Sequence, residues 1–391
     1  MLPITSAQAE DGGFLQALKD GDFSLSFRYR LETVDQDNFT EDAEASTLRT
    51  RLNYHSGQLG NFSFFVEVDD VSEIGPDDFN STRNGLTQFP VVADPTGTAV
   101  NQAWLDFIPT PNNRFVLGRQ RINHGDERFI GGVAWRQNEQ TYDAITWTNS
   151  DIEGLDFQYG YINRVKRIFG PDDGVPSDDF DSDSHIFHAQ YSFDPLATLS
   201  AYGYWLDFKN AAAASSKTLG LRLSGKYKME STELGYAAEW ATQDDYGDNP
   251  IDYTADFYRF EINARHRWLN AAIGVDVLEG DADRPGSAFS TPLATLHKFQ
   301  GWADIFLNTP AAGIVDRRAS LGADIKGYKL VFIYHDFEAQ DGNLNYGDEI
   351  NLQLTKSFGK YGSLLIKYAQ YYADDFAFDS RRFWFQYAFG F

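Results

Sequence analysis

Aromatic and polar side chains alternate along the last residues of the chain, 381–391. The aromatic positions are Phe383, Phe385, Tyr387, Phe389 and Phe391. A β-strand points successive side chains to opposite faces, so this period of two predicts a strand with one aromatic face and one mixed face. A soluble sheet also buries such a face, and the alternation alone leaves the surroundings of the strand open.

The same alternation recurs along the whole chain, and short turns and long polar segments take turns between the alternating stretches. Residues 14–21 predict a short helix or turn ahead of the first strand. The predicted strands cover residues 22–34, 45–59, 62–70, 100–107, 114–122, 142–148, 154–165, 185–193, 198–208, 217–228, 232–243, 255–268, 271–278, 317–326, 328–338, 348–358, 362–372 and 381–391. The chain is therefore expected to be all-β.

Residues 299–307 are the ambiguous stretch, because they also fit a strand. The two rims of a membrane barrel differ, with short turns on one side and long loops on the other. A strand at 299–307 would put the long loops around Asp341 and Asp375 on the short-turn side. Residues 279–316 are therefore expected to form one long loop with a helical turn inside it. About 18 strands remain, an even number as in single-chain bacterial barrels.

The strand predicted at 255–268 shows what surrounds the sheet. Its apolar face carries Phe260, Ile262, Ala264 and Trp268, and its polar face carries Arg259, Glu261, Asn263, Arg265 and Arg267. Such a row cannot fill a dry core, because burying unpaired polar groups is costly. It can line water. The pattern favours a transmembrane antiparallel β-barrel with lipid outside, and a barrel of about 16–18 strands holds an aqueous channel.

Length and composition agree with a single barrel domain over residues 10–391. The 391 residues contain no Pro- or Gly-rich linker, and 16% of them are aromatic. No apolar run approaches the ~20 residues of a spanning helix, which excludes a helical membrane protein. Ala7-Gln8-Ala9 follows a short apolar stretch and resembles the end of a secretory signal peptide. Residues 1–9 are accordingly expected to be a signal-peptide remnant.

The net charge of −24 is concentrated in a few polar segments. Segments 35–44, 69–80, 172–183, 244–256, 279–283 and 374–379 hold 27 of the 57 acids and neither lysine nor arginine. The rest of the chain has 30 acids against 33 bases, so the predicted strands are not acidic. Acidic loop tips can hold divalent cations near lipopolysaccharide, although solvated loops are the simpler interpretation. The weak Ca²⁺ candidate is Asp178, Asp179, Asp181 and Asp183.

Arginines dominate the positions that alternation assigns to the lumen. One group, on the first two strands and the last, becomes contiguous when the barrel closes: Arg28, Arg30, Arg49, Arg51 and Arg382. A second group follows on later strands: Arg222, Lys226, Arg259, Arg265 and Arg267. Rings of arginine favour anions, and guanidinium groups bind carboxylates in a bidentate manner. Inward acids such as Glu32, Glu67 and Glu239 would pair with many of them, so structural ion pairing and a solute path both stay open.

A third arginine-rich stretch, residues 114–143, contains Arg119, Arg121, Arg128 and Arg136 beside the Gly131-Gly132 pair, which permits a loop that folds tightly back into the lumen. Its motifs are Gly118-Arg119-Gln120, Arg128-Phe129-Ile130-Gly131, Trp135-Arg136-Gln137 and Thr141-Tyr142-Asp143; later ones are 298–310, His335-Asp336-Phe337 and Phe383-Trp384. Together they resemble the alginate-export family of outer-membrane barrels. The resemblance implies about 18 strands around an arginine-lined conduit for an anionic polysaccharide. The aromatic final strand likewise resembles the strand that the barrel-assembly machinery reads.

Other classes of function lack support in the sequence. There is no cysteine, which excludes disulfides and thiolate chemistry. His185 and His188 are three apart on a strand and point to opposite faces, so they cannot bind one metal together. Neither a nucleophile elbow nor a phosphate-binding loop is present, and basic–aromatic nucleic-acid signals are missing.

The sequence thus predicts a bacterial outer-membrane porin, in contact with outer-membrane lipid and lipopolysaccharide, that lets small anionic or saccharide solutes, such as alginate or related acidic oligosaccharides, diffuse passively. No cofactor is expected apart from Ca²⁺ at the acidic loops. A barrel-embedded enzyme, a non-conducting adhesion barrel and a soluble acidic β-protein are the alternatives.

Overall fold

The computed structural model describes residues 11–193 and 196–391, and the expected signal-peptide remnant, residues 1–9, lies outside the described residues. The helical elements are α1 (Asp11–Lys19) and the 3₁₀ turns η1 (Ala212–Ala214), η2 (Leu296–Lys298) and η3 (Gly359–Tyr361). None of the described helices is long and apolar enough to cross a membrane. The strands are β1 (Asp22–Gln36), β2 (Ala43–His55), β3 (Phe62–Asp78), β4 (Gly97–Thr110), β5 (Asn113–Gln120), β6 (Thr141–Asn149), β7 (Leu155–Lys166), β8 (Asp179–Phe193), β9 (Ala197–Leu206), β10 (Ser216–Met229), β11 (Thr232–Asp245), β12 (Thr254–His266), β13 (Leu269–Leu278), β14 (Ile314–Ile325), β15 (Tyr328–Glu338), β16 (Asn345–Ser357), β17 (Ser363–Ala373) and β18 (Ser380–Gly390).

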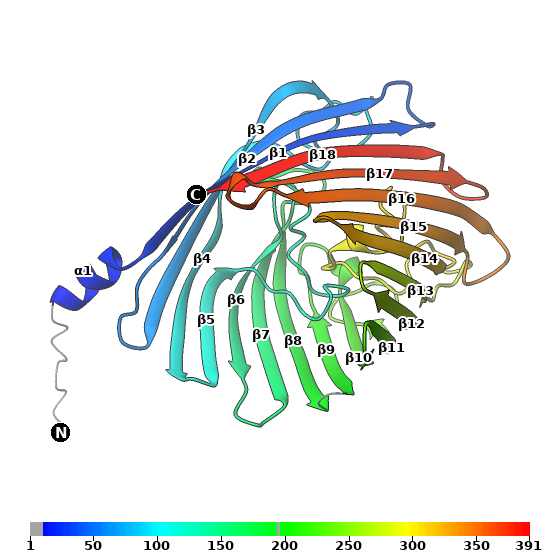
Figure 1. Ribbon diagram of the computed structural model, residues 1–391. Helices are drawn as coiled ribbons and strands as arrows, with labels where there is room; N and C mark the ends of the chain where they lie inside the picture. Colours follow the sequence, from blue (N-terminus) through cyan, green and yellow to red (C-terminus); the bar gives the residue numbers. More distant parts are fainter. Residues whose placement is uncertain (1–10, 194–195) are drawn as a thin grey trace.

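The strands form one closed antiparallel barrel. Each strand pairs with the next along the chain, and β18 returns to pair with β1 from Ser26 opposite Gly390 to Gln36 opposite Ser380. Figure 1 shows this closure, with the red β17–β18 ribbons beside the blue β1. Closure leaves no sheet edge, so the backbone groups within the bilayer are satisfied by strand pairing. The prediction of an 18-strand transmembrane barrel is confirmed.

From β3 to β15 the connections between strands alternate between long and short, as expected for two different rims. Residues 279–313 form one long connection that contains η2, which confirms the assignment of this stretch as a loop. Several strands are longer than predicted; within the acidic segments, β3 runs on to Asp78 and β8 begins at Asp179. Parts of the acidic segments are therefore strand rather than loop. Beyond the bilayer a paired ribbon lies in water, where acidic side chains cost little.

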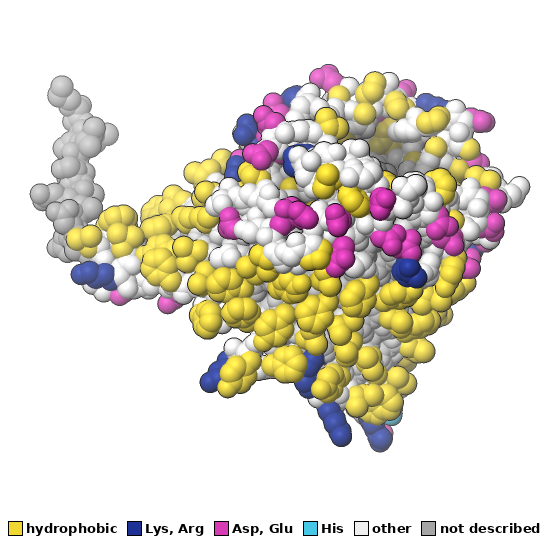
Figure 2. Space-filling view, turned by 90° about the horizontal axis from the view of Figure 1, so that it is seen from above, with side chains coloured by type: hydrophobic (Ala, Val, Ile, Leu, Met, Phe, Trp, Pro, Cys, Tyr) yellow, Lys and Arg dark blue, Asp and Glu magenta, His cyan; other side chains and the backbone are white. Residues whose placement is uncertain are grey.

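Side chains alternate between lipid and lumen along each strand. On β10, the exposed fractions of Leu219, Leu221 and Leu223 are 40%, 49% and 41%, whereas Arg222 and Ser224 face the interior. Figure 2 shows the resulting hydrophobic band, with acidic side chains gathered along one rim and basic ones at the opposite end. An apolar outer band of this kind is typical of membrane barrels.

Two long loops enter the barrel and pack against each other. The first, residues 121–140, is called here the infolded loop, and the second is residues 279–313. Ile130 and Leu293 form a parallel β-bridge between them, and both side chains are fully buried. A Cβ atom at Gly131 would lie 2.4 Å from the Thr295 hydroxyl, so glycine is needed for this approach. The lumen is consequently narrowed from within by its own loops.

The outward and inward positions of β10 give a direct test of the membrane assignment. Leu223→Arg is expected to lower the free energy of unfolding by about 2–4 kcal/mol, because a charge near the bilayer midplane is costly. Ser224→Arg, at the neighbouring lumen-facing position, should have a much smaller effect. Urea unfolding in lipid vesicles measures both, and equal losses for the two variants would contradict the assignment.

Candidate solute pathway

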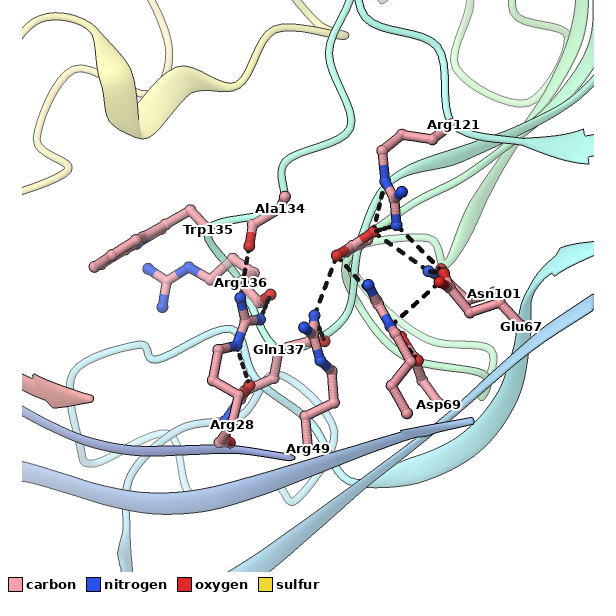
Figure 3. A network of polar contacts seen from close by, with 12 residues as sticks. Arg28, Arg49, Glu67, Asp69, Asn101, Arg121, Ala134, Trp135, Arg136 and Gln137 are labelled. Atoms are coloured by element: carbon pink, nitrogen blue, oxygen red, sulfur yellow. Dashed lines mark hydrogen bonds and ion pairs between the residues drawn. The ribbon is translucent and has the colours of Figure 1, made fainter. Parts of the chain in front are cut away.

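The infolded loop is fixed to the wall formed by β1 and β2. The Arg28 guanidinium donates to the carbonyl oxygen of Ala134 at 2.8 Å, to the Gln137 side-chain oxygen at 2.9 Å and to the carbonyl oxygen of Arg136. Gln137 in turn donates to the Thr47 hydroxyl at 2.9 Å. Figure 3 shows the contacts of Arg28 with the loop, with the strands below and the loop above. The loop backbone is thus bonded directly to strand side chains.

Glu139 is the centre of the loop attachment. Its carboxylate accepts from Arg49 at 3.1 Å, from Arg51 at 2.9 Å and from Arg121 at 2.8 Å. Arg51 also binds Asp69 in a bidentate manner, with both distances 2.7 Å. The Glu139 side chain is 3% exposed, so these charges interact with little screening by water. Three guanidinium groups therefore share one buried carboxylate.

The charge on Glu139 persists over a wide pH range. Burial raises the pKa of Glu139, but Arg51, Arg121 and Arg49 outweigh burial and hold the pKa at about 2. Because the pKa of Glu139 is lower in the folded protein than in the unfolded chain, the ionised carboxylate stabilises the attached loop at any pH above the unfolded-state pKa. This stabilisation is lost as the pH falls towards 2. The loop attachment is therefore intact at neutral and mildly acidic pH.

Arg136 connects the infolded loop to the second loop and to the first strand. It donates to Glu32 of β1 at 3.1 Å and to Asp304 of the second loop at 3.0 Å. Arg382 of β18 reaches Glu32 as well, at 3.2 Å. Arg30 lies 3.5 Å from Asp94 and stacks over the Trp135 ring. The inward-facing arginines of β1, β2 and β18 are thus occupied in holding the loops, whereas Arg381 lies outside this assembly and pairs with Asp35.

Lys367 of β17 belongs to the same assembly, and the sequence analysis did not single it out. Its Nζ lies 2.6 Å from His297 Nε2 and 3.6 Å from the centre of the Trp302 ring. The Asp304 carboxylate can only accept, so His297 Nδ1 donates to it at 2.7 Å and Nε2 of the neutral ring accepts from Lys367. Burial lowers the pKa of His297 to about 3, which keeps this ring neutral. The alternation of side chains along β17 places Lys367 on the lumen face, which was the available signal. Alternation does not identify the residues that Lys367 contacts.

The second arginine group lines the opposite wall, on β10 to β14. Arg259 binds Asp276 through two bonds of 3.0 and 2.9 Å, and Arg318 binds Asp276 at 2.7 Å. Arg222 and Arg259 both donate to Asp126 of the infolded loop, at 2.8 and 2.6 Å. A cavity of about 160 Å³ lies among these groups. This wall stays partly open, because the Arg222 side chain is 24% exposed.

Two further cavities continue from this wall and share Arg222 and Ser224. One, of about 290 Å³, extends to His124, His188 and the Tyr202–Tyr204 pair. The other, of about 540 Å³, includes Lys226, Glu261 and Asn263 and leads towards the short-turn rim. Arg222 therefore lies where three cavities meet, and together they follow the β8–β14 side of the lumen.

The rim at the end of this route carries exposed bases. They are Lys226, Lys228, Arg265, Arg267, Lys326 and Lys329, on the strand ends and turns from β10 to β15. The acids on the same stretch are Glu230, Glu233 and Asp324. Lys226 is 72% exposed despite an ion pair with Glu233 at 3.2 Å. This stretch of the rim is basic, whereas the opposite rim carries the acidic segments.

Two predicted pathway residues lie elsewhere. Arg119 is opposite Ala103 and Asp143 on the outer face, in the same alternation as Leu117, and pairs with Asp143 at 2.8 Å. Arg267 is in the turn after β12, where its φ of 54° ends the strand, so it lies at the rim and not in the lumen. Arg128 is inside but 1% exposed, covered by Gln300 and Phe299.

The acidic residues named as a Ca²⁺ candidate are spread along the start of β8 and the preceding loop. Asp179, Asp181 and Asp183 occupy alternate positions of the strand, and Asp178 precedes it. Asp179 pairs with Arg164 at 3.2 Å. Over residues 11–193 and 196–391, no three acidic or histidine side chains are grouped as they would be to hold a metal ion.

A closed 18-strand barrel with an apolar belt and loops folded into a charged lumen defines the porin class of bacterial outer-membrane channels. Its fold matches OccK9 (OpdG) of Pseudomonas aeruginosa, with a TM-score of 0.73 and 16% identity over 96% of this chain and 100% of that chain. OccAB4 of Acinetobacter baumannii matches with a TM-score of 0.72 and 15% identity, over 95% of this chain and 98% of that chain. P. aeruginosa OpdK, crystallised with vanillate, matches with a TM-score of 0.70 and 14% identity, over 96% of this chain and 100% of that chain.

The chain belongs to the alginate export family, whose sequence model matches residues 20–268. This confirms the resemblance drawn from the motifs around the infolded loop, and it places the protein in the outer membrane. No curated protein matches the chain.

Removal of the shared carboxylate tests the loop attachment. Glu139→Gln leaves three guanidinium groups without their common counter-charge, and breaking a buried ion pair costs about 3–5 kcal/mol. The infolded loop should become mobile, and single-channel currents in planar bilayers should show larger fluctuations. Asp143→Asn, which removes the same charge from the outer face, is the matched control and should leave the currents quiet. Unchanged fluctuations in Glu139→Gln would show that the loop is held by other contacts.

Proposed function

We propose that this protein is a passive channel for small anionic solutes, such as sugar acids and other carboxylates, and that the solute moves along the β8–β14 side of the lumen to the basic rim at β10–β15. The observation that carries the proposal is the location of the cavities. They meet at Arg222 and lead to the basic rim, whereas the inward arginines Arg30, Arg49, Arg51 and Arg382 of β1, β2 and β18 are buried beneath the loops.

The preference for anions is assigned to the basic mouth and not to the inner cavity. Around the smallest cavity, Arg222, Arg259, Lys298 and Arg318 face Asp126, Glu261, Asp276 and Asp316. These charges balance, so this section offers hydrogen-bond donors and acceptors without a net charge. Such a lining suits hydroxyl-rich solutes. The β10–β15 part of the mouth has six bases against three acids and concentrates anions there.

The relatives support a carboxylated solute. The family is named for the export of alginate, which is a polyanion, and OpdK was crystallised with vanillate, which is a carboxylate. The acidic outer rim repels anions, so the preference should be modest. A monomeric or short sugar acid fits cavities of about 160–540 Å³.

We also propose that the barrel is not an enzyme. Of the described histidine–carboxylate pairs, His297–Asp304 ends on the ammonium of Lys367, and His335–Asp316 is buried in the wall. Neither pair is hydrogen-bonded to a serine hydroxyl that could serve as a nucleophile. Assays of lipid and peptide hydrolysis should therefore give only background rates, and turnover of either substrate would contradict this part of the proposal.

Neutralising the mouth tests the anion preference. In the double variant Lys226→Gln/Arg265→Gln, the ratio of anion to cation permeability should fall on the order of twofold, because two of the six basic groups at the mouth are lost. Reversal potentials under a KCl gradient across a planar bilayer measure this ratio. Lys356→Gln is the control, since Lys356 stacks on Tyr328 on the outer face. Cation selectivity of the unmodified protein, or an absence of conductance, would overturn the proposal.

A further inference from the structure

The helix α1 lies outside the barrel wall, at the rim that carries the short turns. The Tyr54 hydroxyl donates to the carbonyl oxygen of Leu18 at 2.6 Å, and the Gly57 amide donates to that of Ala17 at 2.8 Å. Tyr54 is opposite Phe23 on the outward face, and their rings are 4.5 Å apart. Figure 1 shows α1 beyond the start of β1, away from the lumen. The helix is therefore attached to the lipid-facing side of the barrel and cannot plug the channel in this position.

The helix has one apolar face that the protein leaves uncovered. At 100° per residue, Phe14, Leu15 and Leu18 fall within one arc of about 100°. The exposed fractions of Phe14 and Leu15 are 53% and 56%. Gln16 and Asp20 occupy the opposite side and are hydrogen-bonded to each other at 2.7 Å. Ala17, which is 5% exposed, faces the barrel.

This apolar face continues the belt that contacts lipid. The nearest members of the belt are also exposed, with Phe23 at 72%, Leu59 at 42% and Phe62 at 42%. Gly13 approaches Leu59, since a Cβ atom there would lie 3.4 Å from Leu59 Cδ1. In Figure 2 hydrophobic side chains run without a break from the barrel along the projecting arm. The surface of α1 is thus contiguous with an interface whose partner is already lipid.

We propose that α1 is an interfacial anchor that lies in the periplasmic leaflet of the outer membrane, with Phe14 and Leu15 inserted at the boundary between headgroups and acyl chains. Short amphipathic helices bind membranes in this way, with the polar face towards water. The attachment to Tyr54 and Gly57 holds the helix at the height of the aromatic rings of the rim. The inference is independent of the solute that the channel carries.

The absence of native cysteine makes the test clean, because a single introduced thiol is the only one to label. Leu15→Cys and Gln16→Cys variants of the full chain carry an environment-sensitive fluorophore and are reconstituted into phosphatidylethanolamine–phosphatidylglycerol vesicles. The label at position 15 should emit at shorter wavelength than the label at position 16. Doxyl-labelled lipid should quench the label at position 15 several-fold more strongly, and aqueous iodide should quench it several-fold less.

The two labelled positions are adjacent on one helix, so misassembly affects both alike, and the heat-dependent shift of the folded barrel in gel electrophoresis checks assembly. Phe14→Cys supplies a second apolar position and should behave as Leu15→Cys does. Equal iodide quenching at positions 14, 15 and 16 would overturn the proposal. Water exposure of that kind would mean that the helix lies in the aqueous phase and not in lipid, or that its apolar face binds another protein.

Discussion

One carboxylate shared by three guanidinium groups organises the interior of this barrel. Charged groups cannot remain unpaired away from water, and Glu139 resolves this for Arg49, Arg51 and Arg121 together. Because Glu139 lies on the infolded loop and two of its partners lie in or beside the β2 wall, the ion pairs that satisfy the wall also fix the loop. Arg136 and Lys367 attach the second loop in a similar way, through Asp304 and His297.

The need for pairing divides the lumen into two functional halves. On the β1, β2 and β18 side, inward-facing arginines are bonded to loop carboxylates and backbone oxygens, and the loops cover this wall. On the β10–β15 side, Asp126 is the main loop contribution, and the cavities that meet at Arg222 remain open. The protein thus uses the same residue type for two purposes, and the position of the loops decides which purpose each arginine serves.

Alternation predicted the barrel because lipid and water impose it on every strand, and the 18 strands and the loop at 279–313 followed from it. The ends of strands such as β3 were missed, because contact with lipid no longer imposes an apolar outer face where the paired strands extend into water. Arg119 was placed in the lumen by its motif, although the parity of Phe115 and Leu117 already put it outside. The partners of Arg28 and Lys367 could not be predicted, because parity gives the face of a side chain and not the loop that covers it.

The open path follows β10, and the infolded loop seals the β2 wall. Thiol accessibility in this cysteine-free chain measures both directly: Ser224→Cys lines a cavity, and Thr47→Cys lies under Gln137. An anionic methanethiosulfonate reagent should reduce the single-channel current of Ser224→Cys and leave that of Thr47→Cys unchanged. Faster block of Thr47→Cys than of Ser224→Cys would place the path on the other wall and contradict the account.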